Sequence, residues 1–210
     1  MKTEKKKLFT AKSMGFTAIS IALATVLSMI RIFRMPMGGS VTPFSMFFVT
    51  FPGFLFGPVM GFIGGLVYGL FQMISGGTFL SVPQVLCDYF FAFIVMGVSG
   101  FLRNRKYGLL TGYIAGVFGR FVFAVLSGVL FFAEYAEGSG HGAFIYSVLY
   151  NGGYIGAEAL ITCILLFIPP VRSALSKIRS FANEKGGIRK KDKEAVNSGE
   201  TPEIKEKPED

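Results

Sequence analysis

The sequence predicts an all-α integral membrane protein, a compact bundle of six transmembrane helices with both termini in the cytoplasm. The chain has 210 residues, is 51% hydrophobic and has a mean hydropathy of +0.54. Apolar runs of about 18 residues or more are separated by short polar stretches, which is the pattern of membrane-spanning helices. Charge is concentrated at the ends, because residues 13–170 hold six of the 21 Lys and Arg and four of the 13 acids.

The distribution of charge divides the chain into three regions. Residues 1–12 are a basic cytoplasmic flank, residues 13–170 form the membrane domain, and residues 171–210 are a charged cytoplasmic tail. The tail is expected to be disordered beyond about Ala182, because it is rich in Lys and Glu and poor in aromatic residues. The first four predicted helices cover residues 13–32, 45–56, 59–75 and 82–102. The fifth starts at Tyr107 and the sixth ends near Ile168, with a polar turn at residues 134–142 between them.

The flanking charges predict the orientation in the membrane. Glu134 and Glu137 fall on one side, and the basic segments fall on the other side, which the positive-inside rule assigns to the cytoplasm. These basic segments are residues 2–12, 103–106 and 172–193. Arg31 and Arg34 depart from the rule; either they serve an external loop, or the helix count is wrong. The Gly/Pro-rich loop that follows them, up to Met46, is interpreted as a partly ordered lid.

Composition and motifs argue against several functions. The net charge of +8 comes from cations that flank apolar spans, which indicates a membrane surface and not nucleic acid. The sequence lacks a P-loop, a G-x-S-x-G motif and a Cys/His cluster, so neither an enzyme, a cofactor nor a metal site is predicted. His141 is a single loop histidine, and Cys87 and Cys163 are expected to be buried thiols without a disulfide.

Polar side chains within the last two predicted helices indicate an internal pocket. A charge inside a membrane helix costs roughly 2.5–3.5 kcal/mol on insertion scales, so it normally faces a partner or a cavity. In the fifth helix a four-residue spacing aligns Gly108, Gly112, Gly116, Arg120, Ala124, Gly128 and Phe132. In the sixth helix one face carries Ser147, Asn151, Tyr154 and Glu158.

Arg120 and Glu158 have two possible roles. Their predicted depths are similar, so they form either a buried ion pair that neutralises both charges or part of the pocket. If Arg120 and Glu158 pair, Asp88 is the carboxylate that faces an outer cavity. Alternatively, the Asp88 side chain bends outward and reaches water. An acid among aromatic rings suits an organic cation, and an amide suits a heteroaromatic edge. The residues expected around Asp88 are Tyr89, Phe132, Tyr146, Tyr150 and Asn151.

Small residues recur on two further predicted helix faces. The four-residue series Gly53, Gly57, Gly61, Gly65 and Gly69 is interpreted as tight helix packing. Ala18 and Ala22 form a small-xxx-small pair in the first helix. This pair either contacts a partner helix or packs inside the chain.

Four segments, taken in this order, resemble the thiamine-specific substrate-binding S components of energy-coupling-factor (ECF) vitamin transporters. They are GGSV with a following SM (38–46), CDY with a following AF (87–93), SGVLFFAEYA (127–136) and YSVLYN (146–151). The resemblance spans about residues 14–169. It implies a six-helix protein of the bacterial plasma membrane that captures thiamine from outside. Import would require a transmembrane coupling subunit and two ATPase subunits.

The resemblance also implies roles for individual residues. The family's binding carboxylate and its neighbouring Tyr correspond to Asp88 and Tyr89, and its Ala-xxx-Ala contact with the coupling subunit corresponds to Ala18 and Ala22. Further pocket positions of the family correspond to Arg120, Gly128, Phe132, Tyr146 and Asn151. The chain departs from the family in having no Trp and in carrying Ala124 where a pocket His is expected. A thiamine precursor or analogue is therefore an alternative ligand, and a self-sufficient proton-coupled transporter that uses Asp88, Arg120 and Glu158 is an alternative function.

Overall fold

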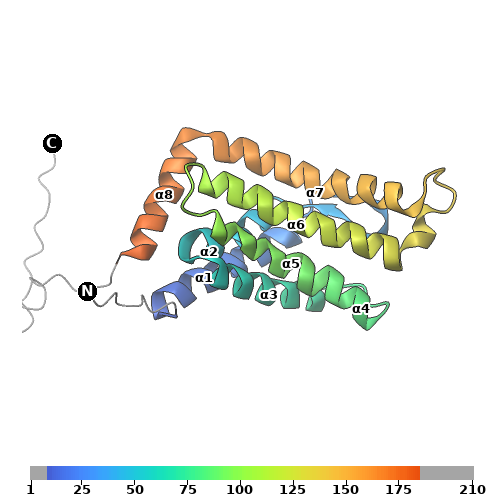
Figure 1. Cartoon of the computed structure of the whole chain (residues 1–210), viewed down its shortest axis with the longest axis horizontal. Coiled ribbons are helices and arrows are strands. Elements are labelled where there is room, and N and C mark those ends of the chain that lie inside the picture. Colours follow the sequence, from blue (N-terminus) through green and yellow to red (C-terminus); the bar gives the residue numbers. More distant parts are fainter. Residues whose placement is uncertain (1–8, 185–210) are drawn as a thin grey trace, which may run out of the picture.

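The structure, a computed structural model, describes residues 9–184. The long helices run side by side along one axis, and a small hairpin follows the first of them (Figure 1). The elements are α1 (Ala11–Met29), β1 (Phe33–Arg34), η1 (Pro36–Gly38), β2 (Ser40–Val41), α2 (Ser45–Phe56), α3 (Pro58–Ile74), α4 (Val82–Val85), η2 (Leu86–Phe91), α5 (Ala92–Ile94), η3 (Val95–Phe101), α6 (Gly108–Phe131), η4 (Ala133–Ala136), α7 (Ala143–Phe167) and α8 (Pro169–Asn183).

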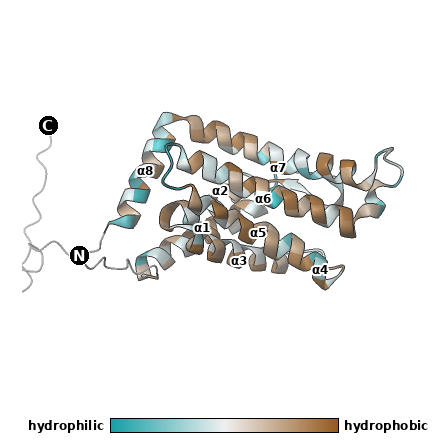
Figure 2. Ribbon diagram, viewed as in Figure 1, coloured by the Kyte–Doolittle hydropathy of each residue, from teal (hydrophilic) through white to brown (hydrophobic). Residues whose placement is uncertain are grey.

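Within the described residues, four helical spans are long and apolar enough to cross a membrane. They are Ala11–Met29, Val82–Phe101, Gly108–Phe131 and Ala143–Phe167. Apolar residues cover the length of α6 and α7, whereas α8 and the segment before α6 are more hydrophilic (Figure 2). Large apolar side chains such as Leu130 and Leu160 stay exposed on the outer faces. A bilayer would cover such a surface.

α2 lies at the centre of the bundle although it has 12 residues. It packs against α1, α3, η3 and α6, and ten of its residues are buried. A helix that is apolar on every side is stable inside a protein, where each face meets another element. α2 therefore supplies much of the core.

Glycines at every fourth position let α3 lie directly against the Val82–Phe101 span. A Cβ added at Gly61 would lie 2.8 Å from the Cα of Gly97, and a Cβ at Gly69 would collide with the backbone carbonyl of Tyr89. The predicted tight packing of this glycine series is therefore confirmed. The contact also fixes the backbone beside Asp88.

The small-residue row of α6 has two halves with different surroundings. A Cβ at Gly112 would lie 2.8 Å from the carbonyl oxygen of Ser99, and one at Gly116 would lie 2.9 Å from that of Met96. This half is packed tightly against η3. Further along the helix, the same face opens into a cavity that is lined by Arg120, Ala124, Gly128 and Phe132.

The segment after α1 is a hairpin and not an irregular loop. α1 ends at Met29, before the predicted Ile32, and β1 pairs antiparallel with β2, with Phe33 opposite Val41. This pairing satisfies backbone groups that an irregular loop would leave without partners. Because Gly38, Gly39 and Ser40 of this segment line the cavity described below, the hairpin is an ordered counterpart of the predicted lid.

The span from Val82 to Phe101 is not the uniform helix that the sequence predicts. It starts as an α-helix that is capped by Ser81, widens to a π-helical turn at Leu86–Phe91, and ends as a 3-10 helix. π-helical turns are rare and are frequently found at functional sites. This turn contains Asp88 and Tyr89.

α8 contacts the start of α1, so the two ends of the described chain lie together. The Lys12 ammonium group donates a hydrogen bond to the Phe181 carbonyl and lies 4.3 Å from the centroid of the Phe181 ring. The start of α1 and the end of α8 therefore lie at the same end of the bundle (Figure 1). The charged tail that the sequence predicts from Val171 begins within α8, which extends to Asn183. The segment predicted to be disordered lies outside the described residues, apart from its start.

Candidate binding cavity

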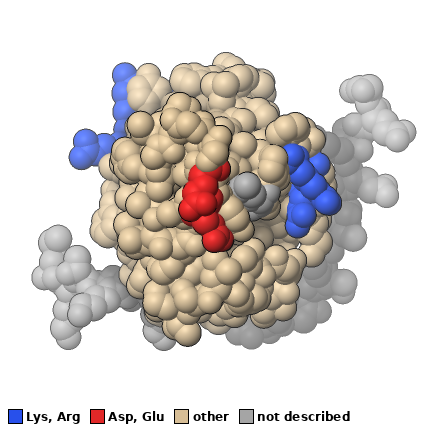
Figure 3. Space-filling model, turned by 90° about the vertical axis from the view of Figure 1, so that its right-hand side faces the viewer, with Lys and Arg blue, Asp and Glu red and all other residues tan. Residues whose placement is uncertain are grey.

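A cavity of about 370 Å³ lies at the end of the bundle opposite α8. Its volume is typical of sites that enclose a small molecule. Figure 3 looks onto this end, where an acidic patch lies beside a group of basic side chains. The cavity is lined by Ser28, Arg31, Gly38, Gly39, Ser40, Thr42, Ser45, Tyr68, Gln72, Ser75, Gly76, Gly77, Thr78, Asp88, Tyr89, Phe93, Arg120, Ala124, Gly128, Phe132, Tyr135, Tyr146, Ser147, Tyr150, Asn151 and Tyr154.

Eight of the nine pocket residues expected from the sequence line this one cavity. Those eight are Asp88, Tyr89, Arg120, Gly128, Phe132, Tyr146, Tyr150 and Asn151. They come from η2, α6 and α7 and from the residue after α6, so the structure brings together positions that are far apart in the chain. Arg31, which departs from the positive-inside rule, lines the same cavity.

The ninth residue, Glu158, does not line the cavity. It is 3% exposed, and its carboxylate accepts hydrogen bonds from Thr42 Oγ1 at 2.6 Å, from Ser45 Oγ at 2.9 Å and from the Met46 amide at 2.9 Å. The residue before α2, Phe44, makes no side-chain capping hydrogen bond. Glu158 therefore caps the N-terminus of α2 from α7, where the helix dipole favours a negative charge.

The buried ion pair between Arg120 and Glu158 is absent from the described residues. The guanidinium group of Arg120 lies over the Phe93 ring, 4.7 Å from its centroid, and Arg120 lines the cavity. The two residues that share a predicted depth therefore face different surroundings. Arg120 contributes positive charge to the cavity wall, and Glu158 holds Thr42 and the N-terminus of α2.

Replacing Glu158 is expected to destabilise the protein. In Glu158→Gln one amide NH2 group meets hydroxyl and amide donors, so charge-assisted hydrogen bonds are lost. Such bonds contribute about 1.5–3 kcal/mol, which corresponds to a fall of roughly 5 °C in the midpoint of thermal unfolding. Glu134→Gln, at an exposed acid, is the matched control. An equal midpoint for both variants in a thermal melt of detergent-purified protein would contradict the capping role.

Asp88 is held by a buried partner within its own helix. Gln84, which is 0% exposed, donates from Nε2 to Asp88 Oδ2 at 2.5 Å and accepts from the Leu80 amide through Oε1 at 3.1 Å. Because Gln84 is fixed at both ends of its amide group, it orients the carboxylate toward the cavity. The sequence contained a signal for this contact, because Gln84 and Asp88 are four residues apart on one helix face.

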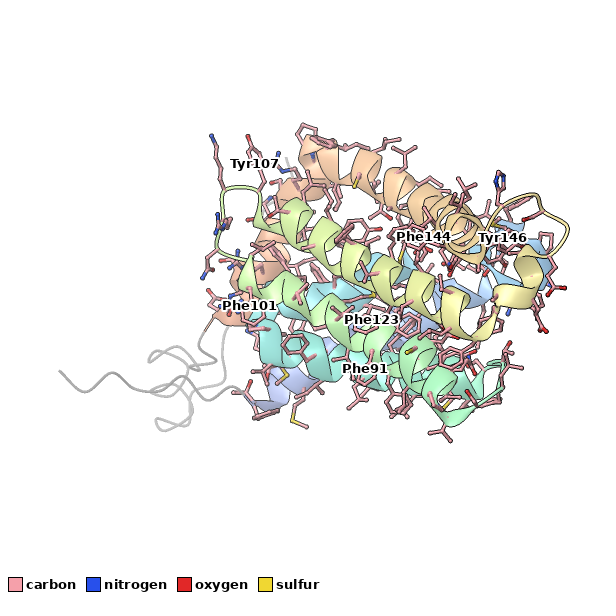
Figure 4. The ribbon with its side chains drawn as sticks, turned by 45° about the vertical axis from the view of Figure 1, so that its right-hand side comes forward. Phe91, Phe101, Tyr107, Phe123, Phe144 and Tyr146 are labelled. Atoms are coloured by element: carbon pink, nitrogen blue, oxygen red, sulfur yellow. The ribbon has the colours of Figure 1, made fainter. Side chains whose placement is uncertain are left out.

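Aromatic rings form much of the cavity wall. Tyr146 and Tyr150 stack with centroids 6.0 Å apart, and Phe132 and Tyr135 stack at 5.6 Å. Tyr146, labelled in Figure 4, lies near the end of the bundle that the cavity occupies. Tyr89 accepts a hydrogen bond from the Thr78 amide through its hydroxyl at 2.7 Å, which holds its ring against the turn after α3. Ring faces of this kind attract organic cations.

Tyr150 joins α7 to the hairpin. Its hydroxyl accepts a hydrogen bond from the Gly39 amide at 2.8 Å and donates one to the Pro36 carbonyl at 2.5 Å. A Cβ at Gly39 would lie 2.7 Å from this hydroxyl oxygen, so glycine permits the close approach. The hairpin is thus anchored to another wall of the cavity that it lines.

Asn151 lines the cavity, but its amide group is engaged within the protein. Nδ2 donates to the Ser147 carbonyl at 2.9 Å, and Oδ1 accepts from the Tyr154 hydroxyl at 3.0 Å. A Cβ at Gly128 would collide with the Ser147 hydroxyl, so these residues also set the spacing of α6 and α7. A ligand that hydrogen-bonds to Asn151 would have to replace one of these contacts.

A polar network on α3 was missing from the residues selected by sequence. Gln72 Nε2 donates to the Tyr68 hydroxyl at 2.6 Å and to Ser28 Oγ at 2.7 Å, and all three residues line the cavity. Tyr68, Gln72 and Ser75 are spaced as one helix face, and this was the available signal. Tyr154, which the sequence placed on the polar face of α7, and Phe93 also line the cavity, although neither was among the nine residues expected there.

Ala18 and Ala22 are both exposed on the outer face of α1. Their neighbour on this face, Gly15, has nothing within 4 Å of an added Cβ. Within the described residues, the pair therefore does not serve internal packing of the chain. The face remains available to lipid or to another helix.

Comparisons with known proteins agree with this architecture. The family model described as Thiamine transporter protein (Thia_YuaJ) matches residues 14–177. Thiamine transporter ThiT of Bacillus subtilis is 31% identical over 173 residues, which is 73% of this chain and 89% of the relative. Thiamine transporter ThiT of Lacticaseibacillus paracasei is 26% identical over 119 residues, 50% of this chain and 59% of the relative.

A solved structure of ThiT from Listeria monocytogenes superposes with a TM-score of 0.61 at 25% identity, covering 75% of this chain and 94% of that chain. The relatives are bacterial, and four described spans are long enough to cross a membrane, so the chain is a multi-pass plasma-membrane protein. Since the family model covers well over half of the sequence, the chain belongs to the thiamine transporter family.

Proposed function

We propose that the protein is the thiamine-binding S component of an ECF-type vitamin transporter. One observation carries the proposal. In this chain, which belongs to the thiamine transporter family, the Asp88 carboxylate is oriented by the buried Gln84 amide and faces a cavity walled by aromatic rings. Thiamine has a permanently charged thiazolium ring and an aminopyrimidine ring. The carboxylate offers Coulomb attraction, and the ring faces offer cation–π contact and stacking.

The proposed topology has six membrane crossings with both termini in the cytoplasm. In addition to the four long spans, α2 and α3 would cross as shorter helices inside the bundle. The location of the start of α1 and the end of α8 at one end of the bundle supports an even number of crossings. The basic loop at residues 103–106 lies at that same end, as the positive-inside rule requires of a cytoplasmic face.

In the proposed transport cycle, this chain binds thiamine and partner subunits supply the energy for transport. Asp88 and the aromatic rings would hold thiamine in the outer cavity, and the hairpin would close over it through Tyr150. The chain carries no nucleotide-binding motif. A coupling subunit that contacts Ala18 and Ala22, together with two ATPase subunits, would supply the force for release to the inside. The family is one of transporters, and no catalytic role is assigned to any residue.

This division of labour predicts a clear transport result. Proteoliposomes that contain this chain alone should bind thiamine without raising its internal concentration above the external one, with or without a proton gradient. Adding the coupling and ATPase subunits together with internal ATP should produce uphill accumulation. Accumulation driven by a proton gradient in vesicles that contain this chain alone would identify a self-sufficient transporter instead.

A further inference from the structure

A second cavity, of about 400 Å³, lies at the α8 end of the bundle. Its walls come from Phe54 of α2, the segment before α6, the first turn of α6, the last turn of α7, and α8. Five cationic side chains line it, and none of the acids among the described residues does. The five are Arg103, Arg105, Lys106, Arg172 and Arg179.

Two of these cations are held in place by the protein. Arg179 donates from Nη1 to the Arg103 carbonyl at 2.8 Å and from Nη2 to Asn104 Oδ1 at 2.7 Å, and its guanidinium group lies 4.6 Å from the Phe54 ring centroid. Arg103 donates from Nη1 to the Leu55 carbonyl at 3.3 Å. Burial lowers the pKa of both guanidinium groups, and Arg103 adds to the lowering of the Arg179 pKa. Both groups remain charged at neutral pH, because arginine is effectively always protonated.

The other three cations have no polar side-chain partner in the part of the chain that the structure describes. Among the described residues, the side chains of Arg105, Lys106 and Arg172 form neither a hydrogen bond nor an ion pair. Lys106 and Arg172 both lie over the Tyr107 ring, at 5.7 Å and 5.2 Å from its centroid. Figure 4 shows Tyr107 at this end of the molecule. Like charges that converge on one concave surface without an acid repel one another, and a bound anion would offset this repulsion.

Backbone and hydroxyl groups add donors for an anion. The first turn of α6 borders the cavity through Leu109 and Leu110, and no side chain of the described residues caps this helix. Amide groups and the helix dipole at such an end favour a negative ligand. Ser173 and Ser176 line the facing wall.

The position of the cavity indicates the kind of anion. It lies where α6 begins and α7 ends, at the boundary of the apolar spans. Phe167, which lines it, and the adjacent Ile168 are 64% and 42% exposed, so apolar surface continues outward from the basic cavity. A ligand with a charged head and an apolar tail matches both surfaces, and basic pockets at this level of a membrane protein suit anionic lipid headgroups.

We propose that this cavity binds the phosphate group of an anionic phospholipid, with the acyl chains against the exposed end of α7. Arg105, Lys106 and Arg172 contact the phosphate oxygens, and Arg103 and Arg179 hold the floor of the site. Arginine suits this task because its planar fork matches phosphate oxygens. The site is separate from the thiamine cavity and does not depend on the proposed transport function.

The test is a titration of the purified full chain, in neutral detergent, with dioctanoyl phosphatidylglycerol, followed by thermal unfolding and native mass spectrometry. Saturable stabilisation is expected. Arg105→Gln/Arg172→Gln should weaken the apparent affinity about thirtyfold, because each cation near an anionic lipid is worth roughly a fivefold change. Arg34→Gln/Lys177→Gln removes the same charge from side chains that do not line the cavity, and should leave the affinity unchanged. Arg105→Gln alone, at an exposed side chain, should show roughly a fivefold loss if the double variant fails to fold.

Two control ligands test whether the cavity binds an anionic lipid or free phosphate. Dioctanoyl phosphatidylcholine has the same chains and a zwitterionic head, and should bind at least tenfold more weakly. Inorganic phosphate should give no saturable stabilisation at the same concentration. Equal binding of both lipids, or equal losses in the two double variants, would overturn the site. Stabilisation by inorganic phosphate that the lipid does not exceed would assign the cavity to a free anion.

Discussion

Asp88→Asn is expected to weaken thiamine binding roughly tenfold to a hundredfold, because hydrogen bonds to charged groups contribute about 1.5–3 kcal/mol. The substitution keeps the size of the side chain and removes its charge. Gln84 can still donate to the Asn oxygen, so the side chain should keep its orientation. The loss therefore measures the contribution of the carboxylate charge to holding the cation.

A double-mutant comparison separates charge from packing. A thiamine analogue with an uncharged ring in place of the thiazolium should bind the parent protein weakly, and Asp88→Asn should lower its affinity little further. Glu134→Gln removes an exposed acid on η4 that does not line the cavity, and should leave both affinities unchanged. Titration calorimetry of the three proteins with both ligands gives the coupling. Equal thiamine affinity in Asp88→Asn and the parent would exclude this carboxylate as the partner of the cation.

Ala18→Trp and Ala22→Trp are expected to abolish ATP-driven uptake while leaving thiamine binding nearly unchanged. Both alanines lie on the outer face of α1, so a large side chain disturbs no contact within the described chain. A small-xxx-small face lets a partner helix approach closely, and an indole group would prevent that approach. The measurement is uptake by the reconstituted complex, with binding to the isolated chain as the second readout.

Gly156→Trp provides the matched control for this pair. Gly156 is an exposed small residue on α7, and an added Cβ there meets nothing within 4 Å. The variant should bind and transport thiamine as the parent does, because the indole group would face lipid. If Ala18→Trp lost binding together with transport, α1 would be needed for the cavity itself, and the docking role would be wrong.

The sequence predicted most of the helices, because their signal is local. The glycines at fixed spacing were sufficient to predict tight helix packing, whereas the partner of α3, the Val82–Phe101 span, is known from the structure alone. The π-helical turn around Asp88 and the hairpin at Phe33–Val41 were not predicted. Tyr150 of α7 anchors the hairpin at Gly39 and Pro36, and such a contact between distant segments is not visible in the sequence. The helix count and orientation remain predictions.

Glu158 illustrates why a helix face alone does not define a pocket. It continues the face of Asn151 and Tyr154, but it lies about 6 Å deeper than Tyr154 along α7. At that depth the N-terminus of α2 fills the space, and Glu158 hydrogen-bonds to it. Gln84 was not among the expected pocket residues, but it donates the hydrogen bond that holds the Asp88 carboxylate.

Titration calorimetry of thiamine into the purified parent chain, without partners or ATP, tests the central claim most directly. The proposed function predicts saturable binding with one thiamine per chain, and weaker binding of the separate aminopyrimidine half, which lacks the charge that Asp88 would hold. The absence of thiamine binding by folded protein, or tighter binding of the pyrimidine half than of thiamine, would contradict the assignment of this cavity to thiamine.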